Sequence, residues 1–302
     1  MSSSSVIPEV EATGSPPLSL PQVSLKSLKV DLLIREDERV VLEFLSSRPI
    51  HTIYLVGLIR DNGLVSPLNR GVFCAYRNRQ GELEGVALLG QKTIIEAQSQ
   101  IALEAFAPFV AAIPHPHLIR GEKEQVERLQ VYLSGKGRIP HRVFRELLLE
   151  QRACVEKVEQ VRGLHPAELA DSDQVIAINT MMAFEETGIN PLERDPQGFR
   201  QRVTRRISQG RVWVLIDNGR IVFKADVISE TPQAIFIEGV HVDREHRGRG
   251  NGFRCLTQLG RQLLARTSSV CLVVSRENKK AQALYNKAGY KVNSNYVTAF
   301  FK

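Results

Sequence analysis

A basic, glycine-rich loop joins an apolar strand to an amphipathic helix in the second half of the chain. It consists of Arg247, Gly248, Arg249, Gly250, Asn251 and Gly252, within the segment IEGVHVDREHRGRGNGFRCL. Glycines let backbone amides approach an anion closely, and the first turn of the following helix presents unpaired N–H groups and the positive end of its dipole. The alternative is a surface turn that happens to be rich in Arg and Gly. The setting between strand and helix favours a pyrophosphate site.

A second motif follows after a short apolar run, Val270 to Val274. It consists of Asn278, Ala281, Leu284, Tyr285, Lys287, Gly289 and Tyr290. The two motifs together resemble the GNAT family of N-acetyltransferases, in which Arg247, Gly250 and Gly252 fill the phosphate-loop signature. The sequence has no Gly-Lys-Ser/Thr of a P-loop and no early Rossmann strand with a downstream acidic ribose ligand.

The resemblance implies a role for each matching residue. Acetyl-CoA is the expected cosubstrate, with its pyrophosphate on residues 247–252 and its pantetheine arm beside the main chain of Val240 and Val242. Tyr285 matches the general acid that protonates the leaving thiolate, or it is only a packed aromatic residue. Asn278 matches a contact to the cofactor and can also cap the last helix. No spacing of Cys or His predicts a metal site.

Glu238 is the first candidate for the base that accepts a proton from the attacking amine. The period of two along a strand predicts that its side chain shares a face with those of Val240 and Val242. Burial between Ile237 and Gly239 predicts a raised pKa for this carboxyl. The alternatives are an edge glutamate, a salt bridge to Lys224, or water as the base.

Other polar residues receive structural interpretations. By strand parity His241 points to the opposite face from Glu238, and His246 lies in the phosphate loop. The acidic residues Glu185, Glu186 and Glu193 attract a cationic amine or form a solvated face. The arginines at 200, 202, 205 and 206 predict an exposed helix surface, with an acidic partner or RNA as the alternative. Cys255 and Cys271 lie in apolar segments without an obvious base, which argues against an acyl-enzyme.

The elements that position these motifs follow from hydrophobic periodicity. In the second half we expect helices at 171–186, capped by Asp171, and from Asp195-Pro196 to about 210. Strands are expected at 211–216, 220–228, 234–242 and 270–274, with short strands at 291–292 and 296–301. Helices at 252–265 and 278–288 complete this half. The turn Asp217-Asn218-Gly219 is typical of a tight hairpin.

The first half shows a similar pattern. We expect a strand and a helix within 30–47, strands at 71–76, 83–89, 93–97 and 118–120, and helices at 99–112 and 123–133. VFCAYRNRQGELEGVALL parallels VWVLIDNGRIVFKADVIS, and HLIRGEKEQVERLQVYL parallels VCLVVSRENKKAQALYNKAGY. Residues 90–99 (GQKTIIEAQS) lack the glycines and arginines of the loop, and Val131 stands nearest the place of Tyr285. This half resembles a degenerate GNAT unit.

Bulk composition agrees with a two-domain globular protein. The chain has 302 residues, 43% hydrophobic, with a net charge of +7 and four cysteines. No window approaches the roughly 20 apolar residues that a membrane helix needs. The cysteines have neither disulfide nor metal spacing, which indicates a reducing cytoplasm. Residues 1–26 read as a disordered tail without signal-peptide features.

These observations predict an α/β (α+β) protein of tandem GNAT-like domains, each a mixed, mostly antiparallel sheet flanked by helices. The boundaries are 27–154 for the degenerate domain and 155–302 for the catalytic domain. The second domain is expected to transfer an acetyl group from acetyl-CoA to a primary amine, on a small molecule or a protein, within a ternary complex. The alternatives are a non-catalytic acyl-CoA sensor and an RNA-associated protein, the latter disfavoured. No membrane partner is expected.

Overall fold

The strands of the protein join two similar halves into one sheet. The computed structural model describes residues 30–113, 117–155 and 160–301, so the expected tail at 1–26 lies outside the described residues. Within the described residues the strand order is β1-β2-β3-β4-β5-β12-β6-β11-β10-β9-β8-β7. Only the pairs β4–β5 and β10–β11 among these strands are parallel, so the sheet is mixed and mostly antiparallel.

The first half contains ten main elements in chain order. They are β1 (Val30–Leu32), α1 (Glu38–Ser46), α2 (Pro49–Asn62), β2 (Gly71–Arg77), β3 (Leu83–Gly90), β4 (Lys92–Ala97), α3 (Gln100–Ala112), β5 (His117–Glu122), α4 (Lys123–Ser134) and β6 (Arg142–Gln151). The expected strands and helices are present. We predicted neither α2 nor β6, because α2 carries apolar residues around most of its circumference and β6 mixes charged with apolar residues.

The second half repeats this succession. It contains β7 (Leu164–Pro166), α5 (Ser172–Thr187), the short α6 (Pro191–Arg194), α7 (Pro196–Ser208), β8 (Val212–Asp217), β9 (Arg220–Glu230), β10 (Ile235–Val242), α8 (Asn251–Leu264), β11 (Val270–Ser275), α9 (Lys279–Lys287) and β12 (Lys291–Phe301). The two short strands expected near the carboxyl end form one strand, β12, interrupted by a register shift between Val292 and Ser294.

Local sequence signals account for most boundaries. The carboxylate of Asp195 accepts a hydrogen bond from the Gly198 amide (3.0 Å) at the start of α7. Asn218 and Gly219 both have positive φ, as the hairpin between β8 and β9 requires. The expected cap at Asp171 is wrong, because its carboxylate instead accepts from the Glu168 amide (2.8 Å) in the turn before α5.

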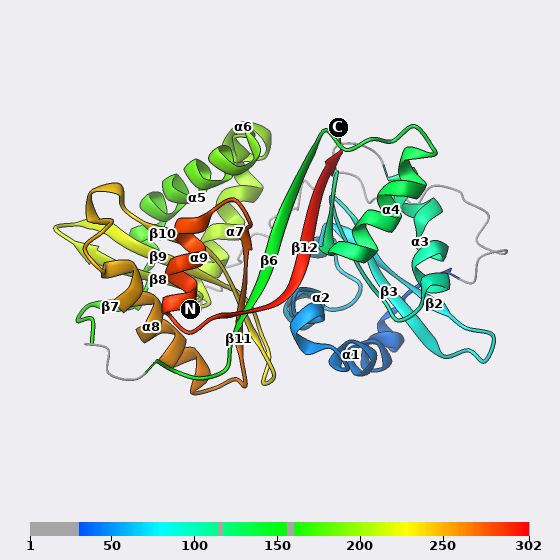
Figure 1. Ribbon diagram of the computed structural model, residues 1–302, viewed down its shortest axis with the longest axis horizontal. Coiled ribbons are helices and arrows are strands. Elements are labelled where there is room, and N and C mark those ends of the chain that lie inside the picture. Colours follow the sequence, from blue (N-terminus) through cyan, green and yellow to red (C-terminus); the bar gives the residue numbers. More distant parts are fainter. Residues whose placement is uncertain (1–29, 114–116, 156–159, 302) are drawn as a thin grey trace, which may run out of the picture.

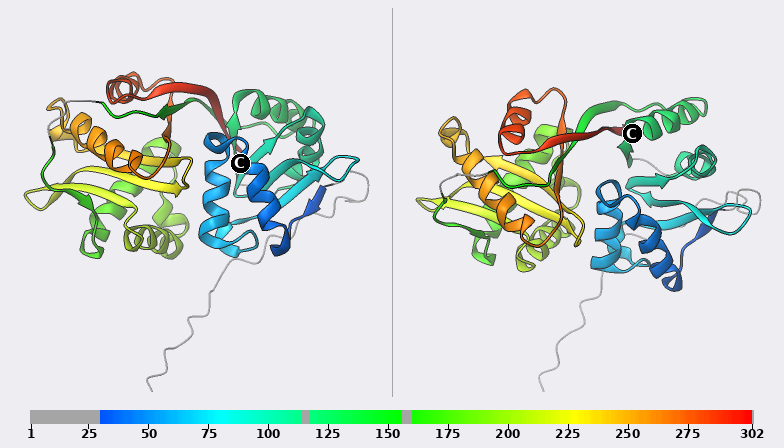
Figure 2. Two further views of the ribbon diagram at one scale, coloured as in Figure 1. Left: turned by 90° about the horizontal axis from the view of Figure 1, so that it is seen from below. Right: turned by 60° about the horizontal axis from the view of Figure 1, so that its bottom comes forward.

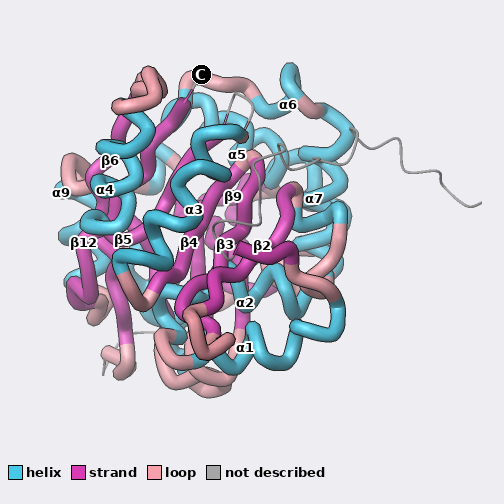
Figure 3. Tube along the Cα trace, turned by 90° about the vertical axis from the view of Figure 1, so that its right-hand side faces the viewer, coloured by secondary structure: helices cyan, strands magenta, loops and turns pink. Residues whose placement is uncertain are grey.

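Helices cover both faces of the sheet in each half. In the first half α3 and α4 pack on one face and α1 and α2 on the other, as the two buried clusters and Figure 3 show. In the second half α8 and α9 cover one face, and α5 and α7 cover the other. Each half is therefore a three-layer unit with its own core.

The two halves exchange a strand at the centre of the sheet. β6 pairs with β11 of the second half, and β12 pairs with β5 of the first half. β6 and β12 also pair with each other, and Figure 1 shows them as two long strands running between the lobes. The domain boundary that we expect at residue 154 therefore divides the chain into two halves, but strands from both halves pair in one sheet.

Helix α2 forms the second connection between the halves (Figure 2). Its residues Ile50 and Ile53 join a buried cluster with Phe236 of β10 and Cys271 of β11. In its last turn, Asp61 accepts hydrogen bonds from Arg211 on both carboxylate oxygens, with 2.8 Å between Nη2 and Oδ1. Because α2 lies against the strands that carry the expected site, the first half forms one wall of that site.

Candidate active site

The glycine-rich loop lies at the mouth of α8, as its pattern predicts. β10 ends at Val242, a short turn follows, and α8 begins at Asn251. Gly248 and Gly250 have φ of +77° and +79°, values that residues other than glycine seldom adopt. No side chain caps the start of α8, so its first amides face outward and are available to an anion.

Gly252 serves a different purpose from the other two glycines. A Cβ at this position would lie 2.9 Å from Cγ2 of Val242, so the absence of a side chain lets α8 approach β10 closely. The side chain of Asn251 accepts a hydrogen bond from Arg254 (2.7 Å). These contacts hold the loop against the end of β10.

The two arginines of the loop differ in their surroundings. The Nε of Arg247 donates to the carbonyl oxygen of Val242 (2.9 Å), which turns this side chain back along β10. Arg249 is exposed. His246 contacts Asp243 (3.1 Å), so it is held in the turn that precedes the loop. Both guanidinium groups of the loop are therefore exposed at the mouth of α8, and the Val242 carbonyl positions that of Arg247.

The strands β10 and β11 separate directly beyond a short parallel pairing. They pair at Ile235 with Val270 and at Phe236 with Cys271, and at no later residue of the described strands. The main chain of β10 beyond Phe236 is thus left unpaired on this side. An extended ligand such as a pantetheine arm can hydrogen-bond to such an edge.

A bulge in β10 overturns our prediction that Glu238 shares a face with Val240 and Val242. Gly239 has a φ of +61°, and the register with β9 shifts between Glu238 and His241. The extra residue reverses the alternation of side chains. Val240 and Val242 pack with the core beneath α8 and α9, whereas Glu238 points toward the first half.

Buried charges hold this bulge. The ammonium of Lys224, which has no solvent exposure, donates to the carbonyl oxygen of Gly239 (3.2 Å). It also pairs with Asp226 (2.8 Å), which Arg206 contacts on its other oxygen (3.3 Å). The expectation that Arg206 lies on an exposed helix face is therefore wrong, because this side chain completes a buried network.

The partner of Glu238 comes from the first half of the chain. Its Oε1 accepts a hydrogen bond from Nη1 of Arg120 on β5 (2.8 Å), rather than from Lys224. Burial acts to raise the pKa of Glu238, but the positive charges of Arg120 and Lys92 outweigh this effect and lower the pKa overall. The predicted raised pKa is therefore wrong.

A second carboxylate, Glu186, lies near this ion pair at the end of α5. Burial and the charges of Glu238 and Glu146 raise its pKa, against the opposing effect of Arg120. The side chain is nevertheless exposed to solvent. Whether Glu186 attracts a cationic amine or is a solvated residue, the two alternatives expected from the sequence, stays a prediction.

Tyr285 and Asn278 occupy the helix that follows β11. Tyr285 is buried in the core beneath α8 and packs edge-on against Tyr290, with 5.9 Å between ring centroids. Burial raises the pKa of its hydroxyl to about 12. The side chain of Asn278 accepts from the Ala281 amide (3.0 Å), so the expected cap is present. Cofactor contact by Asn278 and acid catalysis by Tyr285 stay predictions.

The first half lacks a comparable phosphate loop. Only Gln98 and Ser99 separate β4 from α3. Beyond the short pairing of β4 with β5, the guanidinium of Arg48 bridges Glu96 on β4 (2.9 Å) and Glu122 on β5 (2.6 Å). Two carboxylates and their bridge occupy the place that corresponds to the opening between β10 and β11.

Three further properties of the described residues bear on function. None of their helices is long and apolar enough to cross a bilayer. None of their His, Cys, Asp and Glu side chains group in threes suited to a metal ion. All four cysteines are free thiols, and burial raises the pKa of Cys255 to about 12 and that of Cys271 further. Neither Cys255 nor Cys271 has the properties of a nucleophile.

Comparison with known proteins supports the class that the fold and the loop indicate. Residues 208–292 match a family model described as an acetyltransferase (GNAT) domain. A comparison with curated protein sequences finds no match. The chain therefore carries a GNAT acetyltransferase domain in its second half.

Solved structures extend the likeness over nearly the whole chain. A Drosophila protein covers 90% of this chain and 98% of its own length at 11% identity, with a TM-score of 0.66. A GNAT-family acetyltransferase from Colwellia psychrerythraea covers 91% and 100% at 12% identity, with a TM-score of 0.58. A tandem GNAT protein from the clavulanic acid biosynthesis pathway covers 90% and 98% at 12% identity, with a TM-score of 0.55. These likenesses establish the fold.

Proposed function

We propose that the second half transfers an acetyl group from acetyl-CoA to a primary amine by direct attack within a ternary complex. The observation that carries this proposal is the opening between β10 and β11, which ends at the glycine-rich mouth of α8. A diphosphate on residues 247–252 would lead the pantetheine arm along the main chain of Val240 and Val242, with Asn278 beside it. The thioester would then lie near the bulge at Gly239.

The reaction needs one bond made, one broken and two protons moved. The amine nitrogen attacks the thioester carbonyl carbon, and collapse of the adduct breaks the carbon–sulfur bond. A main-chain N–H of β10 beside the bulge would stabilise the oxyanion. The attacking amine is neutral, and the nitrogen of the tetrahedral adduct gives its extra proton to Glu238, directly or through water. Tyr285 gives its proton to the departing thiolate, and the proton on Glu238 returns to Tyr285 through solvent. Holding both reactants in place would supply much of the acceleration.

The surroundings of the candidate groups support these roles. A tyrosine whose pKa is raised to about 12 stays protonated at neutral pH, as an acid must. The carboxylates Glu238 and Glu186 lie on the face where an acceptor would meet the thioester, and they would attract an ammonium group. The free cysteines agree with a reducing compartment, and we propose the cytoplasm as the location.

Calorimetry with acetyl-CoA, followed by a panel of amines scored for released thiol, tests the proposal. We expect saturable binding of acetyl-CoA and thiol release with at least one class of amine. Binding without thiol release from any amine would replace the enzyme with an acyl-CoA sensor. Absence of binding would overturn both.

A further inference from the structure

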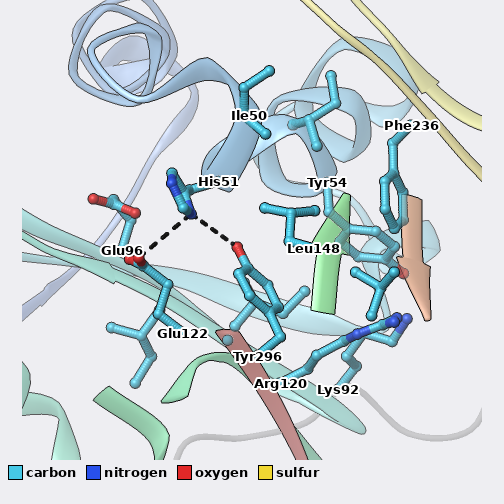
Figure 4. A pocket seen from close by; sticks show the side chains of 15 residues that line it. Ile50, His51, Tyr54, Lys92, Glu96, Arg120, Glu122, Leu148, Phe236 and Tyr296 are labelled. Carbon is cyan, nitrogen blue, oxygen red and sulfur yellow. Dashed lines mark hydrogen bonds and ion pairs between the residues drawn. The ribbon is translucent and has the colours of Figure 1, made fainter. Parts of the chain in front are cut away.

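A pocket lies between the two halves on the face of the sheet that carries Glu238. Ile50 and Tyr54 of α2 and Phe236 of β10 line it (Figure 4), together with Val273 of β11. Phe236 is the last residue of β10 that pairs with β11, so the pocket adjoins the opening proposed for the thioester. Its volume is about 40 Å³, enough for roughly three water molecules or one small functional group.

Two cationic side chains of the first half line this pocket. Lys92 of β4 and Arg120 of β5 reach it at the end away from Glu96 and His51 (Figure 4). The ammonium of Lys92 lies 4.3 Å from the ring centroid of Tyr54 and forms no ion pair with a carboxylate that the structure describes. Lys92 thus brings an unpaired positive charge to the pocket.

Arg120 has unused hydrogen-bonding capacity. One terminal nitrogen binds Glu238, the other lies 3.5 Å from Glu146, and its Nε is buried without a hydrogen bond. A guanidinium group has five donors, and a buried donor without an acceptor is unfavourable. Glu146 is also shared, since it accepts a hydrogen bond from Thr298 (2.6 Å).

At the opposite end of the pocket, ion pairs within the protein already neutralise part of the charge of the acidic side chains. Arg48 bridges Glu96 and Glu122, and Nδ1 of His51 lies 3.2 Å from the hydroxyl of Tyr296 and 3.6 Å from Glu122. The groups in the pocket that lack a full complement of partners are therefore cationic. A ligand with a carboxylate would supply acceptors to both Lys92 and Arg120.

We infer that this pocket binds the carboxylate of the acceptor, and that the acceptor is a free amino acid. The inference rests on the proposed function and names its substrate class. The carboxylate would bind Arg120 and Lys92, while the amine of the same molecule would lie toward Glu238 and Glu186. The volume of about 40 Å³ fits the carboxylate group of such an acceptor and leaves its amine outside the pocket.

The inference also gives the ion pair between the halves a function. A substrate carboxylate on Arg120 competes with Glu238 for the same guanidinium group. Glu238 then loses part of its stabilising counter-charge and becomes a stronger proton acceptor at the moment the amine arrives. The first half would thus contribute to binding and selecting the substrate.

Matched pairs of acceptors test the inference. Glycine with methylamine, alanine with ethylamine, and phenylalanine with phenethylamine differ only by the carboxylate. We expect kcat/KM for thiol release to favour at least one amino acid over its matched amine by about tenfold or more. Arg120→Met and Lys92→Met should each reduce that ratio toward one, mainly by raising KM for the amino acid. Lys123→Met, next to the pocket strand but paired with Glu127 at the surface, should keep the wild-type ratio.

The possible results distinguish failure of carboxylate binding from failure of the proposed acetyltransferase activity. Turnover of the decarboxylated amines at equal or higher kcat/KM would overturn the inference and leave the acetyltransferase standing. An unchanged ratio in Lys92→Met, a variant that breaks no ion pair among the described residues, would also overturn it. Thermal melting of each variant identifies loss of folding in Arg120→Met. Absence of thiol release with every amine would overturn both.

Discussion

Arg120 on β5 and Glu238 on β10 form a hydrogen-bonded ion pair of 2.8 Å across the two halves, although 118 positions separate them in the chain. The pair joins the strand of the degenerate half to the strand that would hold the thioester. Each half therefore determines the electrostatics of the other. A carboxylate assigned as a base from the second half alone has its proton affinity set by the first.

Glu238→Gln should lower kcat by about 100-fold, because a carboxylate that accepts the amine proton is lost. Initial rates of thiol release measure the effect. Glu245→Gln, at an exposed position in the turn after β10, serves as the control. If kcat in Glu238→Gln equals that of the wild type, the proton leaves through Glu186 or water.

The pH dependence of kcat/KM should follow the lowered pKa of Glu238. A base is inactive when protonated, so a lowered pKa confines the loss of activity to pH values below the ordinary glutamate range. Arg120→Met removes the largest counter-charge and should move the acidic limb toward neutral pH. Profiles recorded with a decarboxylated amine avoid the effect of Arg120 on carboxylate binding. A limb that does not move in Arg120→Met would argue that another group titrates.

Tyr285→Phe should lower kcat by about 100-fold while the affinity for acetyl-CoA stays the same, because only protonation of the thiolate is impaired. Calorimetry and steady-state rates separate the two quantities. Tyr290→Phe is a matched control, since Tyr290 packs against Tyr285 and its buried hydroxyl has no hydrogen bond. Equal loss of kcat in both variants would indicate a packing role for Tyr285.

Arg247→Ala and Arg249→Ala should each weaken acetyl-CoA binding by about tenfold, as expected for the loss of one charge-assisted contact to a phosphate. The dependence of Kd on salt should decrease in both variants. Calorimetry at two ionic strengths measures both effects. Arg79→Ala, in the hairpin between β2 and β3, should bind as the wild type does. Unchanged affinity in both loop variants would contradict the pyrophosphate assignment.

Gly239→Ala should destabilise the protein by about 1–3 kcal/mol, because alanine is strained at this φ. In addition, its Cβ would meet the ammonium of Lys224 at 2.8 Å. Gly210→Ala shares a positive φ, but no atom lies within 4 Å of its added Cβ, so it reports the strain alone. Chemical denaturation measures the difference. Equal losses in the two variants would show that the buried ammonium adapts without cost.

The sequence predicted the structure wherever the conformation of a segment depends only on residues close to it in the chain. The glycines at 248 and 250, the helix start at Asp195-Pro196 and the Asn-Gly hairpin depend only on residues close to them in the chain, so the sequence pattern predicted them. The two motifs around Arg247 and Tyr285 and the alternation of elements likewise predicted two GNAT-like halves. These features depend on backbone conformation and local hydrophobic pattern.

Tertiary structure alone decided the exchange of β6 and β12, the reversal of side chains at Gly239 and the pairing of Arg120 with Glu238. A strand of mixed composition can be identified only from its pairing with neighbouring strands in the sheet. A bulge is likewise defined by its register with the adjacent strand. The pKa of Glu238 depends on charges brought from 118 positions away, and electrostatic energy follows distance in space rather than separation along the chain. For this protein the cofactor loop is local in the sequence, whereas the surroundings of the proposed base exist only in the folded pair of halves.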